Sequence, residues 1–341
     1  MILAGDIGGT SARLACFELE RGRLRADRVE RYASRDYRGL GEIVRAFMGA
    51  REGEISVAAF GIPGPVRSGE AVTPNLPWVV TQAELAAALG IDAVWLLNDL
   101  EANAYGLPLL GPEDLAAINE GRRDPHGNLA VVSAGTGLGE AAALWVGPGH
   151  RPFAGEGGHS SFAPRDALEA ELLLHLHRRI GHVSWERVVS GPGLCAIYEF
   201  LRDSGRGVEP PSVREEMRSG DPAAVISGAA LTGRCALCAA ALDLFVSLYA
   251  AEAGNFALKV LATGGVYLGG GIAPKIVEKL RAPDFMRSFS GKGRMRDLLE
   301  TIPVSVVLNE GTALLGAARF AALRAGLPDP GCSPRGAGKA A

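Results

Sequence analysis

Short apolar segments that end in glycine recur along the chain. The first residues, "MILAGDIGG", form such a segment, and the apolar run "NLAVVSAG" leads into "TGLGE" in the same way. Each is followed by a second run of β-compatible residues, "ARLACFEL" and "EAAALWV" respectively. Two such runs joined by a short glycine loop predict a β-hairpin. Because the two hairpins lie far apart in the sequence, we expect two similar α/β halves.

Glycine is the compositional outlier, with 46 residues that cluster at the ends of apolar runs. Glycine lets backbone N–H groups approach a ligand closely, and consecutive N–H groups that point inward bind anions. Several such loops together suit a polyphosphate. The P-loop pattern, GxxxxGK followed by Ser or Thr, is absent, so no loop lysine of that type holds the phosphates. The segment "GLGEAA" fits GxGxxA, but a dinucleotide fingerprint requires a following helix, and "EAAALWV" predicts a strand.

Composition and charge narrow the class of protein. The chain has 341 residues, of which 48% are hydrophobic and 21% charged, which is typical of a globular protein long enough for two domains. The formal net charge of −3 argues against nucleic acid as the main partner. We expect no membrane segment and a cytoplasmic location, because long uncharged apolar stretches are absent. The five cysteines are scattered, which indicates reduced thiols.

Two further stretches predict helices. The alanine-rich segment from about residue 222 to 262 is expected to be helical, and its Cys235 and Cys238 have no second cysteine pair nearby, so core thiols are favoured over a zinc site. The run "GGVYLGGGIAP" is expected to end a strand and to open a helix, with Pro274 in its first turn.

One predicted apolar strand ends in two polar residues, for which the sequence allows two interpretations. The run "AVWLL" leads directly into Asn98 and Asp99. Asp99 could be an N-cap with Asn98 as a turn residue, and the strand end alone favours that interpretation. Alternatively, a carboxylate at the carboxyl end of a strand lies where open α/β sheets bind ligands.

The order of motifs along the chain resembles that of the bacterial glucokinase family, over residues 3 to about 325. The segments that carry the resemblance are "TPNLPW", "NDLEANAYG", "GTGLG", "GEGGHSSFAP", "WERVVSGPGL", "LGGGIAP" and "NEGTALLGAA". In addition, "GDIGGTSARL" and "SAGTGLGE" look like the paired phosphate motifs of the actin/hexokinase-like ATPase superfamily, and "GGVYLGGGIAP" resembles its adenosine motif. The cysteine-rich zinc motif of the related ROK sugar kinases is absent, so the resemblance is to the non-ROK type.

The resemblance implies a fold and a reaction. The implied fold is α/β and two-lobed, of the actin/hexokinase-like (ribonuclease H-like) type, with mixed sheets flanked by helices and the active site in the interdomain cleft. The implied reaction is ATP-dependent phosphorylation of glucose at O6, in which Asp99 is the general base that takes the proton from the sugar hydroxyl.

The same resemblance implies the site residues. The implied sugar ligands are Asn75, Asn98, Asp99, Glu156, His159 and Glu186. The implied ATP-binding residues are Asp6, Gly8, Gly9, Thr10, Gly135, Thr136, Gly137, Gly139, Gly269, Gly270 and Gly271. Neither phosphate loop contains a lysine, so charge neutralisation is expected from Mg²⁺, which Asp6 would orient through water.

Two positions depart from the family pattern. Ser161 stands where the family usually has Asp, and we assign it no role. Glu140 stands where an apolar residue is usual, and we expect it to face away from the phosphates, because a carboxylate would repel them.

The resemblance also implies domain limits and leaves alternatives. Residues 1–109 with 310–326 should form a small α/β domain, residues 110–309 a large one, and residues 327–341 a disordered tail. A homodimer is expected from the family. A kinase for another hexose or amino sugar, one that uses another phosphoryl donor, and a regulator or assembly ATPase on the same fold remain as alternatives.

Overall fold

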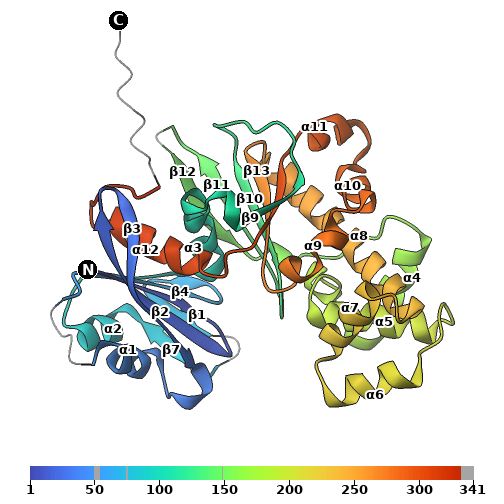
Figure 1. Ribbon diagram of the computed structural model, residues 1–341, viewed down its shortest axis with the longest axis horizontal. Coiled ribbons are helices and arrows are strands. Elements are labelled where there is room, and N and C mark those ends of the chain that lie inside the picture. The colour runs from blue at the N-terminus through green and yellow to red at the C-terminus, as the bar shows by residue number, and fades with distance from the viewer. Residues whose placement is uncertain (50–53, 74–75, 148, 332–341) are drawn as a thin grey trace, which may run out of the picture. The chain divides into compact units, whose positions relative to one another are not determined.

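The structure is a computed structural model that describes residues 1–49, 54–73, 76–147 and 149–331 (Figure 1). The contacts between residues divide the chain into two compact units. The first, here called the N-terminal unit, consists of Met1–Glu113, Arg151–Ala154 and Asn309–Ala341. The second, the central unit, consists of Asp114–His150 and Gly155–Leu308.

The N-terminal unit is built on a five-stranded sheet of order β3-β2-β1-β4-β8. Strand β1 pairs antiparallel with β2, which confirms the first predicted hairpin, and parallel with β4, which in turn pairs parallel with β8. A smaller sheet has the order β5-β6-β7. The strands are β1 (Ile2–Ile7), β2 (Ser11–Glu20), β3 (Arg23–Ala33), β4 (Val57–Ile62), β5 (Val66–Arg67), β6 (Glu70–Val72), β7 (Val79–Thr81) and β8 (Val94–Asn98). The helices are η1 (Ser34–Asp36), α1 (Leu40–Met48), α2 (Gln82–Leu89), α3 (Asp99–Gly106), η2 (Leu107–Leu109), η3 (Pro112–Asp114) at the boundary with the central unit, and α12 (Thr312–Arg324).

Both faces of the five-stranded sheet are covered, which explains why its inner strands are mainly apolar. Every residue of β4 is buried. One face packs on α1, where Phe47 and Ile43 join Phe60 in a single core. The other face packs on α12, through small residues such as Ala317 and Ala59.

Helices α3 and α12 approach each other so closely that glycine is required at the contact. A β-carbon on Gly106 would collide with the carbonyl oxygen of Thr312, and one on Gly316 would collide with that of Ala102. The neighbouring side chains are also small, since Ala102 and Ala313 belong to the same core. The C-terminal helix is therefore fixed to the N-terminal part of the chain by backbone contact.

A six-stranded sheet has the order β12-β11-β10-β13-β14-β9, and it belongs to the central unit except for residues 151–154 of its edge strand β12, which are counted with the N-terminal unit. Strands β10 and β11 are antiparallel, which confirms the second predicted hairpin, and β10, β13 and β14 are parallel. The strands are β9 (Leu115–Asn119), β10 (Leu129–Ala134), β11 (Leu138–Trp145), β12 (His150–Gly155), β13 (Gly265–Gly269) and β14 (Val304–Val307). The helices are η4 (Gly157–His159), α4 (Ala167–Ile180), η5 (Trp185–Arg187), α5 (Gly191–Asp203), α6 (Pro211–Ser219), α7 (Pro222–Leu231), α8 (Ala236–Val260), η6 (Ala273–Ile276), α9 (Val277–Leu280), α10 (Pro283–Ser290), η7 (Gly293–Met295) and α11 (Arg296–Glu300).

Helix α8 is the core helix of the central unit. Its length and apolarity would suffice to cross a membrane, but 72% of its most apolar window is buried inside the structure. Its Tyr249 hydroxyl donates a hydrogen bond to the Val132 carbonyl oxygen in β10, at 2.9 Å, and lies 3.4 Å from the Gly269 oxygen in β13. One helix thus holds two parallel strands of the sheet in place.

The helical prediction for residues 222–262 is confirmed, and the segment forms two helices, α7 and α8. The break contains Gly233 at φ +68°, a left-handed conformation that ends α7. Cys235 then caps α8, since its Sγ accepts a hydrogen bond from the Cys238 N–H at 3.3 Å. The expected helix after "LGGG" begins as the 3₁₀ turn η6, with Pro274 in its first positions, and continues as α9.

Replacement of Gly316 by Ala should destabilise the protein by about 1–3 kcal/mol, because the new methyl group has no space against the Ala102 carbonyl. Gly228 is a matched control, since it also lies within a helix, α7, but a methyl group added there would meet nothing within 4 Å. Gly228→Ala should raise stability by about 0.5–1 kcal/mol. Urea unfolding followed by circular dichroism measures both, and equal stabilities of Gly316→Ala and the wild type would contradict the contact.

Candidate active site

Asn98 and Asp99 lie at the junction of β8 and α3 in the N-terminal unit. Asn98 is buried, and its Oδ1 accepts hydrogen bonds from the N–H groups of Leu100 at 2.9 Å and Glu101 at 3.2 Å. Its Nδ2 donates to the Gly64 carbonyl oxygen at 3.1 Å. The helix cap is therefore Asn98, and the interpretation of Asp99 as the N-cap is wrong.

Asp99 is the first residue of α3 rather than its cap. Its Oδ1 accepts the Leu100 N–H at 2.9 Å. A carboxylate in the first turn of a helix is favoured by the helix dipole. Because Asn98 already caps the helix, the Asp99 carboxylate is not required for that purpose and can serve chemistry.

The parallel strands bring the predicted N-terminal site residues to one edge of their sheet. Asp6 in β1 is opposite Gly61 in β4, and Ile62 in β4 is opposite Asn98 in β8. The loop that contains Gly8, Gly9 and Thr10 follows β1 at the same edge. Carboxyl ends of parallel strands are the usual place for ligands in α/β sheets. The predicted Asn75 lies outside the described residues.

The loop after β1 is held in a fixed shape by backbone hydrogen bonds. The Gly8 N–H donates to the Ser11 oxygen at 2.9 Å, and the Ser34 hydroxyl donates to the Gly8 oxygen at 2.8 Å. Asp6 is half-buried and opposite Arg13 in β2. Burial raises the pKa of Asp6, and the positive charge of Arg13 acts in the opposite direction.

Among the described residues, no group of three or more His, Cys, Asp or Glu side chains could hold a metal ion. Mg²⁺ commonly binds through one or two carboxylates together with substrate phosphates and water. A single carboxylate such as Asp6, beside a glycine loop, fits an ion that arrives with a nucleotide. It does not fit a resident metal held in a cage of side chains.

In the central unit, the glycine loop from Gly135 to Gly139 joins β10 to β11. The Gly135 N–H donates to the Gly137 oxygen at 2.8 Å, and the Gly191 N–H donates to the Gly135 oxygen at 2.8 Å. The second glycine loop lies against the end of β10, because a β-carbon on Gly270 would collide with the Ala134 carbonyl oxygen. The structure thus brings the two predicted nucleotide loops of this unit together.

A hollow of about 640 Å³ adjoins both glycine loops, and all of its walls belong to the central unit. We call it the glycine-loop hollow. Its walls are mainly apolar, with Thr136, Asp221, Ser227 and Lys275 as polar side chains. It is lined by Gly135, Thr136, Gly191, Pro192, Leu194, Cys195, Asp221, Pro222, Ala223, Ala224, Ser227, Gly228, Leu231, Leu242, Gly271, Ile272, Lys275 and Ile276.

Lys275 was missed by the sequence analysis, which looked for a lysine only within the phosphate loops. It follows Pro274 in the first turn of η6, directly after the second glycine loop, and that position is the signal that could have identified it. A mainly apolar hollow lined by glycine loops and one ammonium group suits a nucleoside phosphate.

The central unit also brings together three of the predicted sugar ligands. His159 Nε2 lies 3.8 Å from Glu156 Oε2, and His159 Nδ1 lies 3.9 Å from Glu186 Oε1. The side chains of His159 and Glu156 are 61% and 57% exposed, whereas Glu186 is 26% exposed. The accessible carboxylates can accept hydrogen bonds from several hydroxyl groups, and the imidazole can both accept and donate one.

Glu186 also contacts the first glycine loop. Its Oε2 accepts a hydrogen bond from the Leu138 N–H at 3.1 Å, and a β-carbon on Gly137 would collide with the same oxygen. One carboxylate therefore touches both His159 and the loop between β10 and β11. A side chain at position 137 would therefore displace the Glu186 carboxylate.

The two departures from the family pattern have different surroundings. Ser161 is exposed and pairs through its backbone with Ser184, which links the segments on either side of α4. Glu140 is buried, with 1% of its surface exposed. It lines neither the glycine-loop hollow nor the hollow of about 290 Å³ on the other side of Thr136.

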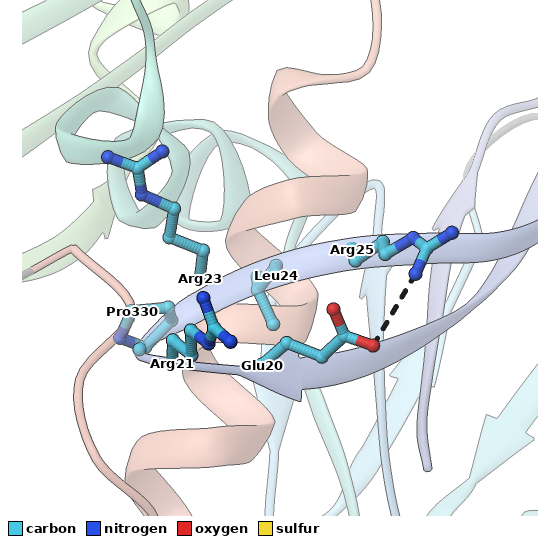
Figure 2. A pocket seen from close by; sticks show the side chains of 7 residues that line it. Glu20, Arg21, Arg23, Leu24, Arg25 and Pro330 are labelled. Atoms are coloured by element: carbon cyan, nitrogen blue, oxygen red, sulfur yellow. Dashed lines mark hydrogen bonds and ion pairs between the residues drawn. The ribbon is translucent and has the colours of Figure 1, made fainter.

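A larger hollow, of about 890 Å³, lies beside the β2–β3 hairpin (Figure 2). Figure 2 shows Arg21, Arg23 and Arg25 around it, with Arg25 Nη1 3.5 Å from Glu20 Oε1. None of the motif residues lines this hollow. Its volume alone does not make it a candidate for the active site.

Comparison with known proteins identifies one family. The glucokinase family model matches residues 3–324. The glucokinase of Nostoc sp. is 41% identical over 338 residues, which cover 94% of this chain and 99% of that protein. Among solved structures, glucokinase from an Antarctic psychrotroph has a TM-score of 0.80 and 32% identity, and the match covers 93% of this chain and 97% of that one. A ROK family glucokinase from Streptomyces griseus, solved in complex with glucose and AMPPNP, has a TM-score of 0.61 and 21% identity, and the match covers 94% of this chain and 98% of that one.

Replacement of Asn98 by Ala should destabilise the protein by about 1–2 kcal/mol, because it removes the acceptor for two N–H groups at the start of α3. Asn98→Asp keeps that acceptor and should lose less stability. Urea unfolding measures the difference, and an Asn98→Ala variant as stable as Asn98→Asp would contradict the capping role.

Proposed function

Because the chain belongs to the glucokinase family, we propose that it transfers the terminal phosphoryl group of ATP to O6 of glucose, with Asp99 as general base. The family assignment makes the protein a kinase that phosphorylates glucose, and it implies ATP as the donor. The single observation that supports the catalytic assignment is the position of Asp99 at the carboxyl edge of β8, beside a residue that already caps the helix. The proposed mechanism requires groups from both units to act on the same pair of substrates.

The glycine-loop hollow is the proposed nucleotide site. Apolar walls suit an adenine ring, and the N–H groups of Gly135, Thr136 and Gly137 suit a phosphate chain. Lys275 adds a positive charge that the phosphate loops themselves lack. The AMPPNP bound to the distant Streptomyces griseus protein supports a nucleotide as the ligand of this fold.

The group of Glu156, His159 and Glu186 is the proposed sugar site, together with Asn98, Asn75 and Asp99. The Asn98 amide uses its oxygen and one hydrogen on the backbone, which leaves one N–H for a sugar hydroxyl. His159 with its two carboxylate neighbours supplies both donors and acceptors. Such a site discriminates between sugars because an absent hydroxyl leaves a polar group without a partner.

The proposed chemistry is an in-line phosphoryl transfer. Asp99 accepts the proton of the 6-hydroxyl while O6 forms a bond to the terminal phosphorus, and the bond from that phosphorus to the bridging oxygen of ADP breaks. Asp6, with Gly8, Gly9 and Thr10, is proposed to orient the nucleotide-bound Mg²⁺ through water. That ion supplies charge neutralisation for the phosphates when it is bound.

The alternatives differ in measurable ways. A kinase for another hexose or for an amino sugar would show a higher kcat/KM for mannose, fructose or N-acetylglucosamine than for glucose, and a regulator would show no turnover. A coupled assay of ADP release separates these cases. The family resemblance also supports a cytoplasmic homodimer, and analytical ultracentrifugation that finds only monomer would contradict the dimer.

Asp99→Asn should lower kcat by about 10²–10⁴-fold, because the amide cannot accept the proton, while the KM for glucose changes little. Asp92→Asn is the matched control, since Asp92 is exposed and lies before the other end of β8, and it should leave kcat unchanged. Steady-state kinetics with glucose and ATP decide the question. Turnover of Asp99→Asn near that of the wild type would remove Asp99 from the mechanism.

Lys275→Ala and His159→Ala should separate the two substrate sites. Loss of the Lys275 charge should raise the KM for ATP by about tenfold, and loss of the His159 imidazole should raise the KM for glucose by a similar factor. Each variant is the control for the other. Lys275→Ala should keep the KM for glucose within about twofold of the wild type, and His159→Ala should keep the KM for ATP within the same range. If both variants changed the same KM, at least one site assignment would be refuted.

A further inference from the structure

Glu140 is a buried carboxyl group in the middle of the central unit. It lies in β11 opposite Val132 of β10, and 1% of it is exposed. By geometry, neither of its carboxyl oxygens has a hydrogen-bond partner among the described residues. An unpaired buried carboxylate is costly.

On one side, the Glu140 carboxyl group supports the segment from Gly155 to His159. A β-carbon on Gly157 would collide with Glu140 Oε2, and one on Gly155 would lie 3.4 Å from the Glu140 carbonyl oxygen. The same segment contains Glu156 and His159, which belong to the proposed sugar site. The buried carboxyl group is thus in direct contact with the backbone that positions these two side chains.

On the other side, the neighbour of Glu140 is Glu252 in α8, which is fully buried. Glu252 Oε2 accepts a hydrogen bond from Asn255 Nδ2 at 2.8 Å, and Lys259 Nζ lies 3.4 Å from Glu252 Oε1. Both partners donate hydrogen bonds to the Glu252 carboxyl group. Tyr249, one turn earlier in α8, is bonded to β10, so the helix cannot easily move away.

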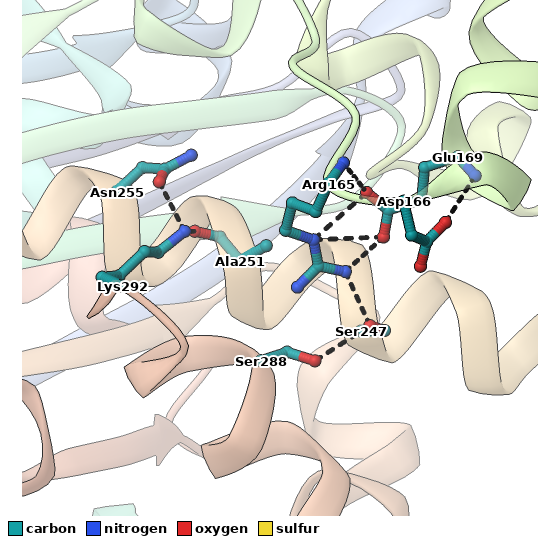
Figure 3. A network of polar contacts seen from close by, with 8 residues as sticks. All are labelled: Arg165, Asp166, Glu169, Ser247, Ala251, Asn255, Ser288 and Lys292. Atoms are coloured by element: carbon teal, nitrogen blue, oxygen red, sulfur yellow. Dashed lines mark hydrogen bonds and ion pairs between the residues drawn. The ribbon is translucent and has the colours of Figure 1, made fainter. Parts of the chain in front are cut away.

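Polar contacts also join helix α8 to Arg165 and Lys292 (Figure 3). Lys292 Nζ donates to the Ala251 oxygen at 3.0 Å and to Asn255 Oδ1 at 2.6 Å, and burial lowers the pKa of Lys292 to about 8. Arg165 is bound to Glu169 and, at 2.8 Å, to the Ser247 hydroxyl. Glu252 and Lys259 are the groups whose charges act on Glu140, and Lys292 is in turn influenced by Arg165, Glu252, Glu169 and Lys259.

Two adjacent buried carboxyl groups cannot both be ionised at low cost. Burial, followed by the negative charge of Glu252, raises the pKa of Glu140 to about 8, although Lys259 acts in the opposite direction. At neutral pH the proton therefore resides on Glu140, which can donate a hydrogen bond to Glu252. Above a pH of about 8, Glu140 loses this proton and becomes a second buried negative charge beneath the Gly155–His159 segment.

We propose that Glu140 is a positioning residue for the sugar site, which holds the Gly155–His159 segment in its binding geometry only while the carboxyl group is protonated. This inference rests on the proposed function, in which Glu156 and His159 bind the sugar. Ionisation of Glu140 makes the contact with Gly157 and the neighbouring Glu252 unfavourable. The segment then moves, and glucose binds more weakly.

The test is the pH dependence of the KM for glucose between about pH 6.5 and 9.5. In the wild type, KM should rise about tenfold from neutral pH to one unit above the Glu140 pKa, because only the protonated fraction is competent, and kcat should change less. Glu140→Gln, which is neutral and of similar shape, should abolish the rise and keep KM at pH 7 within about twofold of the wild type. A rise caused by Lys292 would persist in this variant.

Controls distinguish the possible failures. Glu215→Gln alters an exposed carboxylate on α6 that pairs with Arg218, and it should keep the wild-type profile. If Glu140→Gln does not fold, Glu252→Gln is measured instead. Loss of the negative charge beside Glu140 should lower the pKa of Glu140, so the rise in KM should begin at a lower pH. A wild type without activity on glucose at pH 7 contradicts the proposed function. An active wild type whose profile is the same as that of the Glu140→Gln or Glu252→Gln variant contradicts only the role of Glu140.

Discussion

Parallel pairing of the inner strands is the constraint on which both candidate sites depend. In the N-terminal unit, β1, β4 and β8 run in the same direction, so the loops after Ile7, Ile62 and Asn98 meet at one edge. In the central unit, β10 and β13 are also parallel, so the two glycine loops that follow them lie at the same edge of the sheet. Backbone N–H groups and a few polar side chains are thus gathered by the sheet itself. Glycine follows because the loops lie against neighbouring backbone, as Gly270 does against Ala134.

Within the central unit, Glu186 links two functions through one side chain. One oxygen accepts the Leu138 N–H of the first glycine loop, and the other lies near His159. A change in the geometry of either partner acts on the same carboxylate. The first glycine loop and His159 are therefore connected through Glu186, although β11, β12, η4 and α4 lie between that loop and Glu186 in the sequence.

Much of this arrangement could be predicted from the sequence, because hairpins and glycine loops leave local patterns. The two hairpins and the family were identified from such patterns. The cap at Asn98 was not, because Asn and Asp are both good caps and only the hydrogen bonds distinguish them. The break near Gly233 was hidden by the alanine-rich composition on both sides. Lys275 and the Glu140–Glu252 pair required tertiary structure, because their partners are distant along the chain.

The glycine contact between α3 and α12 has a consequence for biosynthesis. Helix α12 spans Thr312–Arg324, yet it covers a face of the sheet that is made of the first hundred residues. On the ribosome, the apolar surface around Ala4, Ala59 and Leu97 must stay uncovered until nearly the entire polypeptide has emerged. The central unit is complete in the chain before that moment, so the unit that begins translation is the last to close its core.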